Sequence, residues 1–346
     1  MSQFSSGALY RLWLQIQTLL ATIPNTSGTW TQTGAKYVPH NKVTIKRIDP
    51  LIEAQFKTGT GSMLSGVQGG KRYCTADIEI PLMPSGAAGT VPNSDPGLQG
   101  LFGQESTIVA STSVTYSFAD GNGIPFIAAL FNEASGTNTS QFAYGLVVKS
   151  FTLNSGGNGE LILTLECVGF YDLETDNFAS EDTTGKGGLT VYPTEPSSPA
   201  VVGNIIPSFA STITFGGTAV SEFRSMSVKG SNLRDLRMDG IGFYPDPTGV
   251  VQPRRKVVIS SLTFADSNGA GLIAVKNARF TKTPMDVVVV QGNVAGFIVT
   301  QTIKSVQFGD CTFSEDGGGG VNVQFDDSPA HTSAIGNVND ITIAFT

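Results

Sequence analysis

The feature that most constrains this chain is a period of two that runs through residues 147–172. Leu161, Leu163 and Leu165 fall on one face of an extended strand, and polar or β-branched residues alternate with them on the other face. A turn of sequence SGGNG precedes this run, and a second alternating run precedes the turn. Alternation, a Gly/Asn turn and alternation again are the signature of a β-hairpin.

A similar unit returns at residues 303–325, again with a Lys-Ser opening and a glycine-rich turn. Alternating runs recur along the chain, 41 glycines are spread through the turns, and only 14% of the residues are charged. We therefore expect an all-β protein, built as β-sandwiches or half-barrels with long hairpins. A length of 346 residues fits two domains or one large β domain.

Residues 7–23 are predicted to form the one exception, a short amphipathic helix. Apolar side chains recur there at helical spacing, at Leu9, Leu12, Trp13, Ile16 and Leu20. Arg11 and two glutamines interrupt the segment, so neither a secretory signal nor a membrane span is indicated. We expect the helix to dock on a β-surface of its own chain or of a neighbouring chain.

Changes in composition divide the chain into four parts. They are an N-terminal helix and arm (1–40), a first β-module (41–172), a linker or long loop (173–204) and a second β-module (205–346). In the first module, we expect a long hairpin at 45–83 and a loop with a short apolar plug at 84–106. In the second module, the alternating segments predicted as strands include LIAVKNARFTKT at 272–283.

The two modules are predicted to be copies of one unit. Each contains a strand, a Gly/Pro-rich loop, a basic pair and an alternating strand, in that order. Arg72 then corresponds to Lys256, and Lys149 corresponds to Lys304; the two spacings differ by 29 residues, about the length of a loop at 84–112 that the second half lacks. Two unrelated β-halves could show similar alternation by chance, so both explanations stay open at this point.

No motif of catalysis, metal binding or cofactor binding stands out. The three cysteines are widely spaced without a CxxC, and the two histidines, His40 and His331, are far apart. The chain has no nucleophile elbow, no phosphate-binding loop and no calcium loop. A Ser-His-Asp site around His331 or a carboxylate pair for glycoside hydrolysis would need a cleft that the pattern does not indicate. We expect a protein that is not an enzyme, with no cofactor and no metal.

The net charge of −7 and a pI of about 4.9 disfavour a protein that grips nucleic acid through its phosphates. The same acidity suits a surface along which a polyanion slides without binding. Four carboxylates on alternating strands are the candidates for such a surface: Asp77, Glu79, Glu160 and Glu166. Side chains that simply face solvent explain them equally well.

Several segments together resemble the tail tube (major tail) proteins of long-tailed bacteriophages. They are PGLQGLFGQES, VTYSFADG, the hairpin FAYGLVVKSFTLNSGGNGELILTLECVGFYD and the later NIIPSFASTITFGG. The resemblance covers roughly residues 45–346 and leaves out the N-terminal segment. Its motifs are β-patterns, including the closing Val168-Gly169-Phe170, and not fixed catalytic residues.

The resemblance implies a subunit whose sheets join those of neighbouring copies into a ring, with rings stacked into a hollow tube for DNA ejection into the bacterial host. Six modules commonly close such a ring, so two modules per chain imply a trimer with pseudo-sixfold symmetry, or a hexamer if the second half is a decoration. Ring-stacking loops would contain Gly59, Gly61, Met63, Leu64, Val67, Pro245, Asp246, Val250 and Val251. The partners would be further copies, other tail proteins at the tube ends and passing DNA, without a membrane.

This resemblance places the protein in the virion after synthesis in the host cytoplasm. Two other classes remain open. A secreted β-sandwich that binds carbohydrate or acts as an adhesin would expose a platform of aromatic side chains. A hydrolase on a β-scaffold would need a pocket with a perturbed titratable group, for which His331 and Asp239 would be the residues to test.

Overall fold

A computed structural model describes residues 10–21, 30, 34–57, 63–119, 121, 123–132, 140–156, 160–174, 195–196, 212–221, 223–239, 245, 249–265, 269–315, 321–331 and 340–346. This part of the chain is mostly β, with antiparallel sheets and two helices, which confirms the predicted all-β class.

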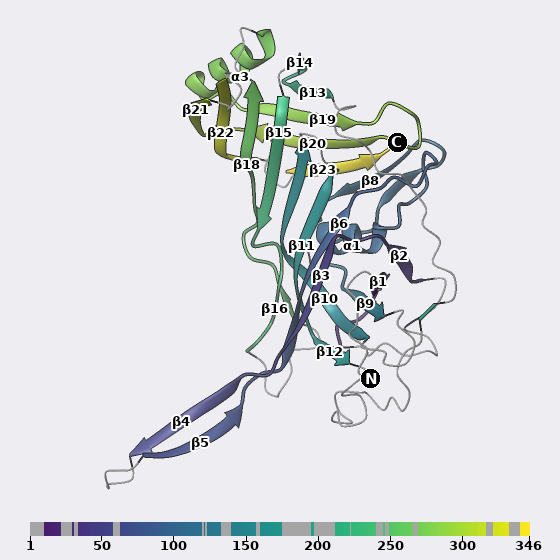
Figure 1. Cartoon of the computed structure of the whole chain (residues 1–346), viewed down its shortest axis with the longest axis vertical. Helices are drawn as coiled ribbons and strands as arrows, with labels where there is room; N and C mark the ends of the chain where they lie inside the picture. Colours follow the sequence, from purple (N-terminus) through teal and green to yellow (C-terminus); the bar gives the residue numbers. More distant parts are fainter. Residues whose placement is uncertain are drawn as a thin grey trace, which may run out of the picture.

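The largest element is an antiparallel sheet that runs the length of the molecule, here called the long sheet (Figure 1). Its eight strands are, in spatial order, β3 (Lys42–Ile48), β6 (Tyr73–Pro81), β11 (Ile162–Gly169), β10 (Gln141–Gly156), β15 (Phe223–Ser231), β18 (Lys256–Ala265), β22 (Val321–Pro329) and β21 (Asp310–Glu315). Strands from both halves of the sequence therefore share one sheet, and β10 and β15 meet where the halves join.

Strand β10 belongs to two sheets because it bends at Gly145. The residues from Val147 onward pair with β11 and β15, whereas the earlier residues pair with β9 (Phe126–Asn132) and β12 (Tyr171–Glu174). Strand β9 continues to β1 (Tyr10–Ile16), which pairs with β2 (Lys36–Val38). Gly145 has a φ of 62°, and a side chain there would collide with the carbonyl oxygen of Leu20, so this bend requires glycine.

A second sheet of seven strands lies across the upper part of the long sheet (Figure 1). Its order is β14 (Thr218–Val220), β13 (Thr212–Phe215), β19 (Met285–Gln291), β20 (Val299–Val306), β23 (Ile341–Phe345), β8 (Ser113–Ser117) and β7 (Thr107–Val109). Here too the halves mix, because β8 from the first half pairs with β23 from the second.

Two short ladders and two helices complete the fold. Strands β4 (Leu51–Lys57) and β5 (Met63–Gly69) form a hairpin that projects beyond the end of the long sheet, and β16 (Asp235–Leu236) pairs with β17 (Val250–Val251). Helix α1 (Asp95–Phe102) contacts β1, β8, β9 and β10, and α3 (Ala270–Thr281) contacts β13 and β14.

One hydrophobic core joins the sheets. Alternate residues of the long sheet, such as Ile78, Leu163 and Val228, pack in the same cluster as Ile213 and Val289 of the seven-stranded sheet. The complementary positions of the long sheet are half-buried or exposed and mostly polar. The period of two in the sequence therefore separates a core face from a polar face, as expected for a sheet packed on one side.

The order of pairing in the first half recurs in the second half. In the long sheet, β3-β6-β11-β10 is followed by β15-β18-β22-β21, and each set begins with two strands joined through a ladder (β4–β5 or β16–β17). Away from the long sheet, the order β2-β1-β9-β10-β12 recurs as β14-β13-β19-β20-β23, and one helix (α1 or α3) follows β6 or β18 in each half. Strands β7 and β8 have no counterpart in this scheme.

The pairing corrects the predicted correspondence of Lys149 with Lys304. Phe151 lies opposite Leu165 and Leu153 opposite Leu163, whereas Cys311 lies opposite Phe325 and Phe313 opposite Val323. These positions match without a gap, 160 residues apart, whereas Lys149 and Lys304 are 155 residues apart. The difference arises because β10 continues directly between the two sheets, and β20 and β21 are separate strands.

The predicted N-terminal helix is wrong. Leu12, Trp13 and Ile16 belong to strand β1, Leu20 is buried in the turn that follows, and Leu9 lies outside the described residues. Because β1 lies between β2 and β9 with both faces covered, Leu12 and Leu14 enter the main core while Trp13 enters a second cluster. A strand buried on both faces needs no polar alternation, and its apolar run imitates helical spacing.

The sequence patterns also do not predict the two helices, α1 and α3. The segment 272–283, predicted as a strand, lies mostly in α3, which buries Leu272, Val275 and Ala278 at a spacing of three. The predicted apolar plug at 98–102 lies in α1, where seven of the eight residues are buried. Both segments are short, and their helical conformation is set by packing against strands that are distant in sequence.

Candidate functional site

The candidate acidic residues lie together on the polar face of the long sheet. Asp77 and Glu166 are directly opposite each other on β6 and β11, and Glu79 is opposite Thr164 on one side and Lys42 on the other. Glu160 is half-buried just before β11. Pairing thus brings three of the four predicted carboxylates onto one face.

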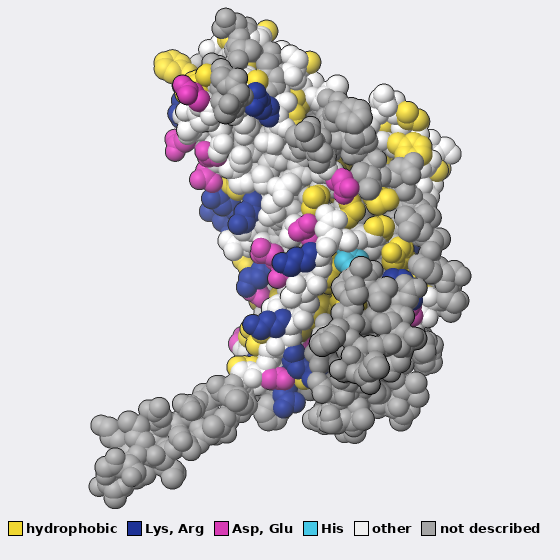
Figure 2. Space-filling model, viewed as in Figure 1, with side chains coloured by type: hydrophobic (Ala, Val, Ile, Leu, Met, Phe, Trp, Pro, Cys, Tyr) yellow, Lys and Arg dark blue, Asp and Glu magenta, His cyan; other side chains and the backbone are white. Residues whose placement is uncertain are grey.

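This face carries both signs of charge. Its carboxylates Asp77, Glu79, Glu166, Asp310 and Asp326 are interspersed with the lysines Lys42, Lys46, Lys229 and Lys256. Serine, threonine, asparagine and glutamine occupy most of the remaining positions. Figure 2 shows basic and acidic side chains side by side on the described surface. The face is therefore hydrophilic and close to neutral, not strongly acidic.

The cysteines are free thiols, and two of them are buried in the core face of the long sheet. Burial raises the pKa of Cys74 well above its ordinary value, with Asp172 adding to the effect. Burial likewise raises the pKa of Cys167, with Asp77 and Glu166 contributing. A thiol whose pKa is raised stays protonated and is a poor nucleophile, so these cysteines act as packing groups.

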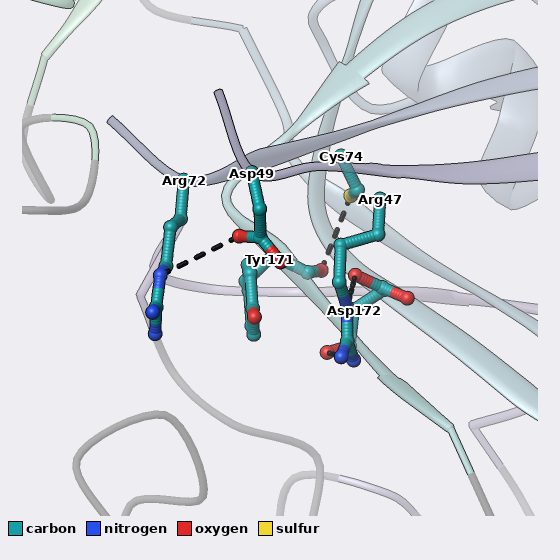
Figure 3. A network of polar contacts seen from close by, with 6 residues as sticks. All are labelled: Arg47, Asp49, Arg72, Cys74, Tyr171 and Asp172. Atoms are coloured by element: carbon teal, nitrogen blue, oxygen red, sulfur yellow. Dashed lines mark hydrogen bonds and ion pairs between the residues drawn. The ribbon is translucent and has the colours of Figure 1, made fainter. Parts of the chain in front are cut away.

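A polar network holds the root of the β4–β5 hairpin (Figure 3). The Arg47 Nε donates to Asp172 Oδ1 at 2.9 Å, and the guanidinium lies 4.9 Å from the centre of the Tyr171 ring. The Cys74 thiol donates to the Tyr171 carbonyl at 3.2 Å, and Arg72 pairs with Asp49 at 3.5 Å. Asp172 is fully buried, so its charge is compensated by Arg47 inside the protein.

The structure describes the candidate stacking loops only in part. Met63, Leu64 and Val67 lie on β5, whose backbone pairs with β4, while Gly59, Gly61 and Asp246 lie outside the described residues. Pro245 is buried, and Val250 and Val251 form β17. The first group belongs to the projecting hairpin, and β17 belongs to the ladder at the equivalent position of the second half.

The long sheet has two free edges among the described strands, β3 at one end and β21 at the other. Five of the six β21 residues are exposed, among them Phe313 at 59%, and β3 presents Lys42, Thr44 and Lys46 to solvent. An unpaired strand exposes backbone donors and acceptors that a further strand can bind. The pairing of the strands, and not a local sequence pattern, identifies β3 and β21 as the edges.

The residues considered for catalysis sit in simple surroundings. The main-chain N–H of the exposed His331 donates to the Lys304 carbonyl at 3.1 Å. Asp239 is exposed and accepts from Arg237 Nε at 2.6 Å, a hydrogen bond that lowers the pKa of the carboxyl. Among the described residues, no three His, Cys, Asp or Glu side chains gather as a metal site would require.

The sequence matches no model of a known protein family, and no curated protein matches it either. Within the described part of the chain, neither helix has the length and apolar content needed to span a bilayer.

Proposed function

We propose that this chain is a structural subunit of the tail tube of a long-tailed bacteriophage, without enzymatic activity. The observation that carries the proposal is the recurring strand order, with the two halves already joined edge to edge through β10 and β15. A unit that joins its own copy in this way, and still has a free edge at each end, is suited to repetition around a ring. The resemblance of its hairpins to tail tube proteins supports the same function.

On this proposal the two halves are tandem tail-tube modules. Three chains then supply six modules and close a ring with pseudo-sixfold symmetry, and a hexamer would form if only the first half builds the ring. The projecting β4–β5 hairpin would contact the next ring in the stack, and other tail proteins would bind at the ends of the tube. The subunit would be made in the host cytoplasm and reside in the virion.

The polar face of the long sheet would line the conduit. In the described strands, its lysines alternate with carboxylates and with hydroxyl and amide side chains, so DNA would pass without tight binding. Asp77, Glu79 and Glu166 would contribute to this lining as members of a mixed surface, and Glu160 lies just before β11.

The secreted carbohydrate-binding or adhesin module gains no support from the two tryptophans. Both tryptophans are buried, Trp13 against Tyr37 and Trp30 against Phe142. They pack inside the second cluster and do not form the exposed platform that sugar rings would stack on.

Negative-stain electron microscopy of the purified protein tests the proposal, with end-on views classified by symmetry. We expect rings or hollow tubes with threefold end views. Rings with strict sixfold symmetry would retain the tube function and refute the use of both modules in one ring. Compact monomers across salt and protein concentration would count against the tube.

A further inference from the structure

The joint between β10 and β15 defines how one half of this chain meets the other. In that joint Thr152 lies opposite Lys229 on the polar face, and Leu153 lies opposite Val228 on the core face. Asn154 lies opposite Ser227 in the next polar pair. The joint thus alternates polar and apolar pairs in register with both halves.

The recurring pairing identifies which strands are equivalent to the two partners of this joint. Strand β21 has the position of β10, because each is the outer partner of the second hairpin in its half. Strand β3 has the position of β15, because each begins the long-sheet strands of its half and pairs with the next strand, β6 or β18. These two equivalents, β21 and β3, are the free edges of the long sheet.

Transferring the register of the joint gives specific pairs between the free edges. Leu153 corresponds to Phe313, because the flanking pairs Leu163–Ile80 and Val323–Phe264 occupy matching rows. Val228 corresponds to Ile45, because their partners Ile259 and Ala76 are matching buried residues, once the one extra residue of β18 at the bulge between Ile259 and Ser261 is counted. Phe313 of one copy would therefore face Ile45 of the next copy. The same register sets Thr312 against Lys46, and Ser314 against Thr44.

The chemistry of these pairs matches the intramolecular joint position by position. Threonine meets lysine in both joints, an apolar pair follows, and two small polar residues come next. In the next row of the core face, Phe151 lies opposite Gly230 within the chain, whereas Cys311 would lie opposite Arg47 between chains, so the larger side chain would come from the other strand.

Charge at the two edges is complementary as well. Strand β3 presents the exposed Lys42 and Lys46 and carries no acid, and its Arg47 is paired with Asp172, whereas β21 carries Asp310 and Glu315 and no base. Pairing between copies of opposite edges is therefore favoured, and pairing of two β3 edges or two β21 edges is opposed by like charges.

The neighbourhood of β21 also has the character of an uncovered interface. Lys276 of α3 lies 5.3 Å from the ring centre of Phe313, and Ile273 and Phe280 share the helix face of that lysine with 43% and 87% of their surface exposed. The equivalent helix α1 is almost fully buried, and Arg234, which follows β15, donates to the Leu101 carbonyl at its end at 2.9 Å. A chain docked on β21 would cover the exposed face of α3 in a similar way.

We propose that β21 of one copy pairs antiparallel with β3 of a second copy, in the register that sets Phe313 against Ile45 and Thr312 against Lys46. The partner of this surface is thus another copy of the chain, bound head to tail. The inference deepens the proposed ring and rests on it for closure, but the joint itself follows from the repeat. Eight strands per chain keep neighbouring strands antiparallel across the joint.

Disulfide trapping tests the register. The variant carries Thr312→Cys and Lys46→Cys, two exposed positions, in a Cys311→Ser background. We expect disulfide-linked oligomers on a non-reducing gel, because β3 and β21 of one chain lie at opposite ends of the sheet and cannot join to each other. The control pairs Thr312→Cys with Lys42→Cys, which lies on the same face four residues away, about 13 Å along the strand.

A second test removes the apolar contact. Phe313→Asp should weaken self-association about tenfold or more in sedimentation velocity, because a carboxylate would replace a ring at the centre of the joint. The matched control is Val294→Asp, an apolar residue of 57% exposure between β19 and β20, which should leave association unchanged. Since both side chains are exposed in the single chain, circular dichroism should show the same fold for both variants.

Each outcome decides between the two proposals. Rings without crosslinks, or equal crosslinking of the register-shifted control, would refute the joint and leave the tube function standing. Crosslinked oligomers that never form rings or tubes would retain the joint and refute the tube. No disulfide-linked oligomer at any protein concentration would overturn the joint.

Discussion

At the scale of single residues, a buried arginine, Arg234, binds the carbonyl oxygens at the end of helix α1. Arg234 is 2% exposed, and its guanidinium donates to the carbonyl oxygens of Leu101 and Phe102 at 2.9 and 3.1 Å. Glycine at position 103 leaves the space that this guanidinium fills. One arginine of the second half therefore satisfies the last carbonyls of α1 in the first half.

Replacing Arg234 with methionine should lower the free energy of unfolding by about 3 kcal/mol, because buried helix carbonyls would lose their donors. Urea denaturation measures the change. Arg237→Met is the control: Arg237 is exposed and pairs with Asp239, so the loss should stay within about 0.5 kcal/mol. Equal losses in both variants would contradict the role of Arg234.

Asp286 holds an irregularity where β19 meets β20. Its carboxylate accepts from Lys304 Nζ and from the Ser305 main-chain N–H, both at 2.8 Å, and Ser305 has a φ of 47°. Partial burial alone would raise the pKa of this carboxyl, but the bonds from Lys304 and Ser305 outweigh it and lower the pKa below its ordinary value.

The lowered pKa of Asp286 predicts a pH dependence of stability. A carboxyl whose pKa is lower in the folded state stabilises the fold above its unfolded-state pKa, and that contribution is lost as the pH falls through the folded-state pKa. The stability difference between wild type and Asp286→Asn should therefore shrink as the pH falls below about 4. Urea titrations of both proteins from pH 7 to pH 3 measure it, and a constant difference would refute the assignment.

At the scale of elements, the bend of β10 decides how the sheets are connected. One 16-residue strand serves two sheets, and a main-chain N–H at the bend donates to Gln17 Oε1 at 2.7 Å. In the second half two separate strands take these positions, β20 in the seven-stranded sheet and β21 in the long sheet. In β10 the change of sheet falls at Gly145, whose positive φ of 62° is a conformation that glycine adopts readily.

Gly145→Ala should therefore destabilise the protein by about 3 kcal/mol, since the methyl group would meet the Leu20 carbonyl oxygen in addition to straining the backbone. Gly217 is the matched control, because it also has a positive φ, 86°, but open space around it. Gly217→Ala should cost about 1 kcal/mol, which is the strain alone. Thermal and urea denaturation compare the two variants, and similar losses would show that the contact with Leu20 is unimportant.

At the scale of the whole molecule, the two halves share both sheets. Strand β10 pairs with β15, β8 pairs with β23, and the guanidinium of Arg255 lies 4.2 Å from the ring centre of Phe118 in the other half. Separating the halves would expose two sheet edges and part of the common core.

We therefore expect the two halves to unfold together in one cooperative transition. Far-ultraviolet circular dichroism and tryptophan fluorescence should give coincident urea curves, although both tryptophans lie in the first half. Two separated transitions would show that the halves are independent domains that only touch.

The sequence predicts those features that depend on neighbouring residues, and it does not predict those that depend on contacts between distant segments. Alternation places Leu163 and Leu165 on a core face and Glu166 on a polar face, and the structure agrees, because a strand in a sheet has only two faces. The repeated hairpin can be predicted for the same reason. The conformation of β1 cannot be predicted from its own sequence, because its burial on both faces depends on β2 and β9, which lie elsewhere in the chain.

The sequence by itself determined the class of fold and the polar and apolar faces of the alternating hairpin strands such as β11, because these depend on local period and turn chemistry. Only the tertiary structure decided that β3 and β21 are the free edges, that the halves are joined through β10 and β15, and that 270–281 is a helix. These features arise from pairing between segments that are far apart in the chain, and pairing energy depends on which strand becomes the neighbour, a choice that no local pattern encodes.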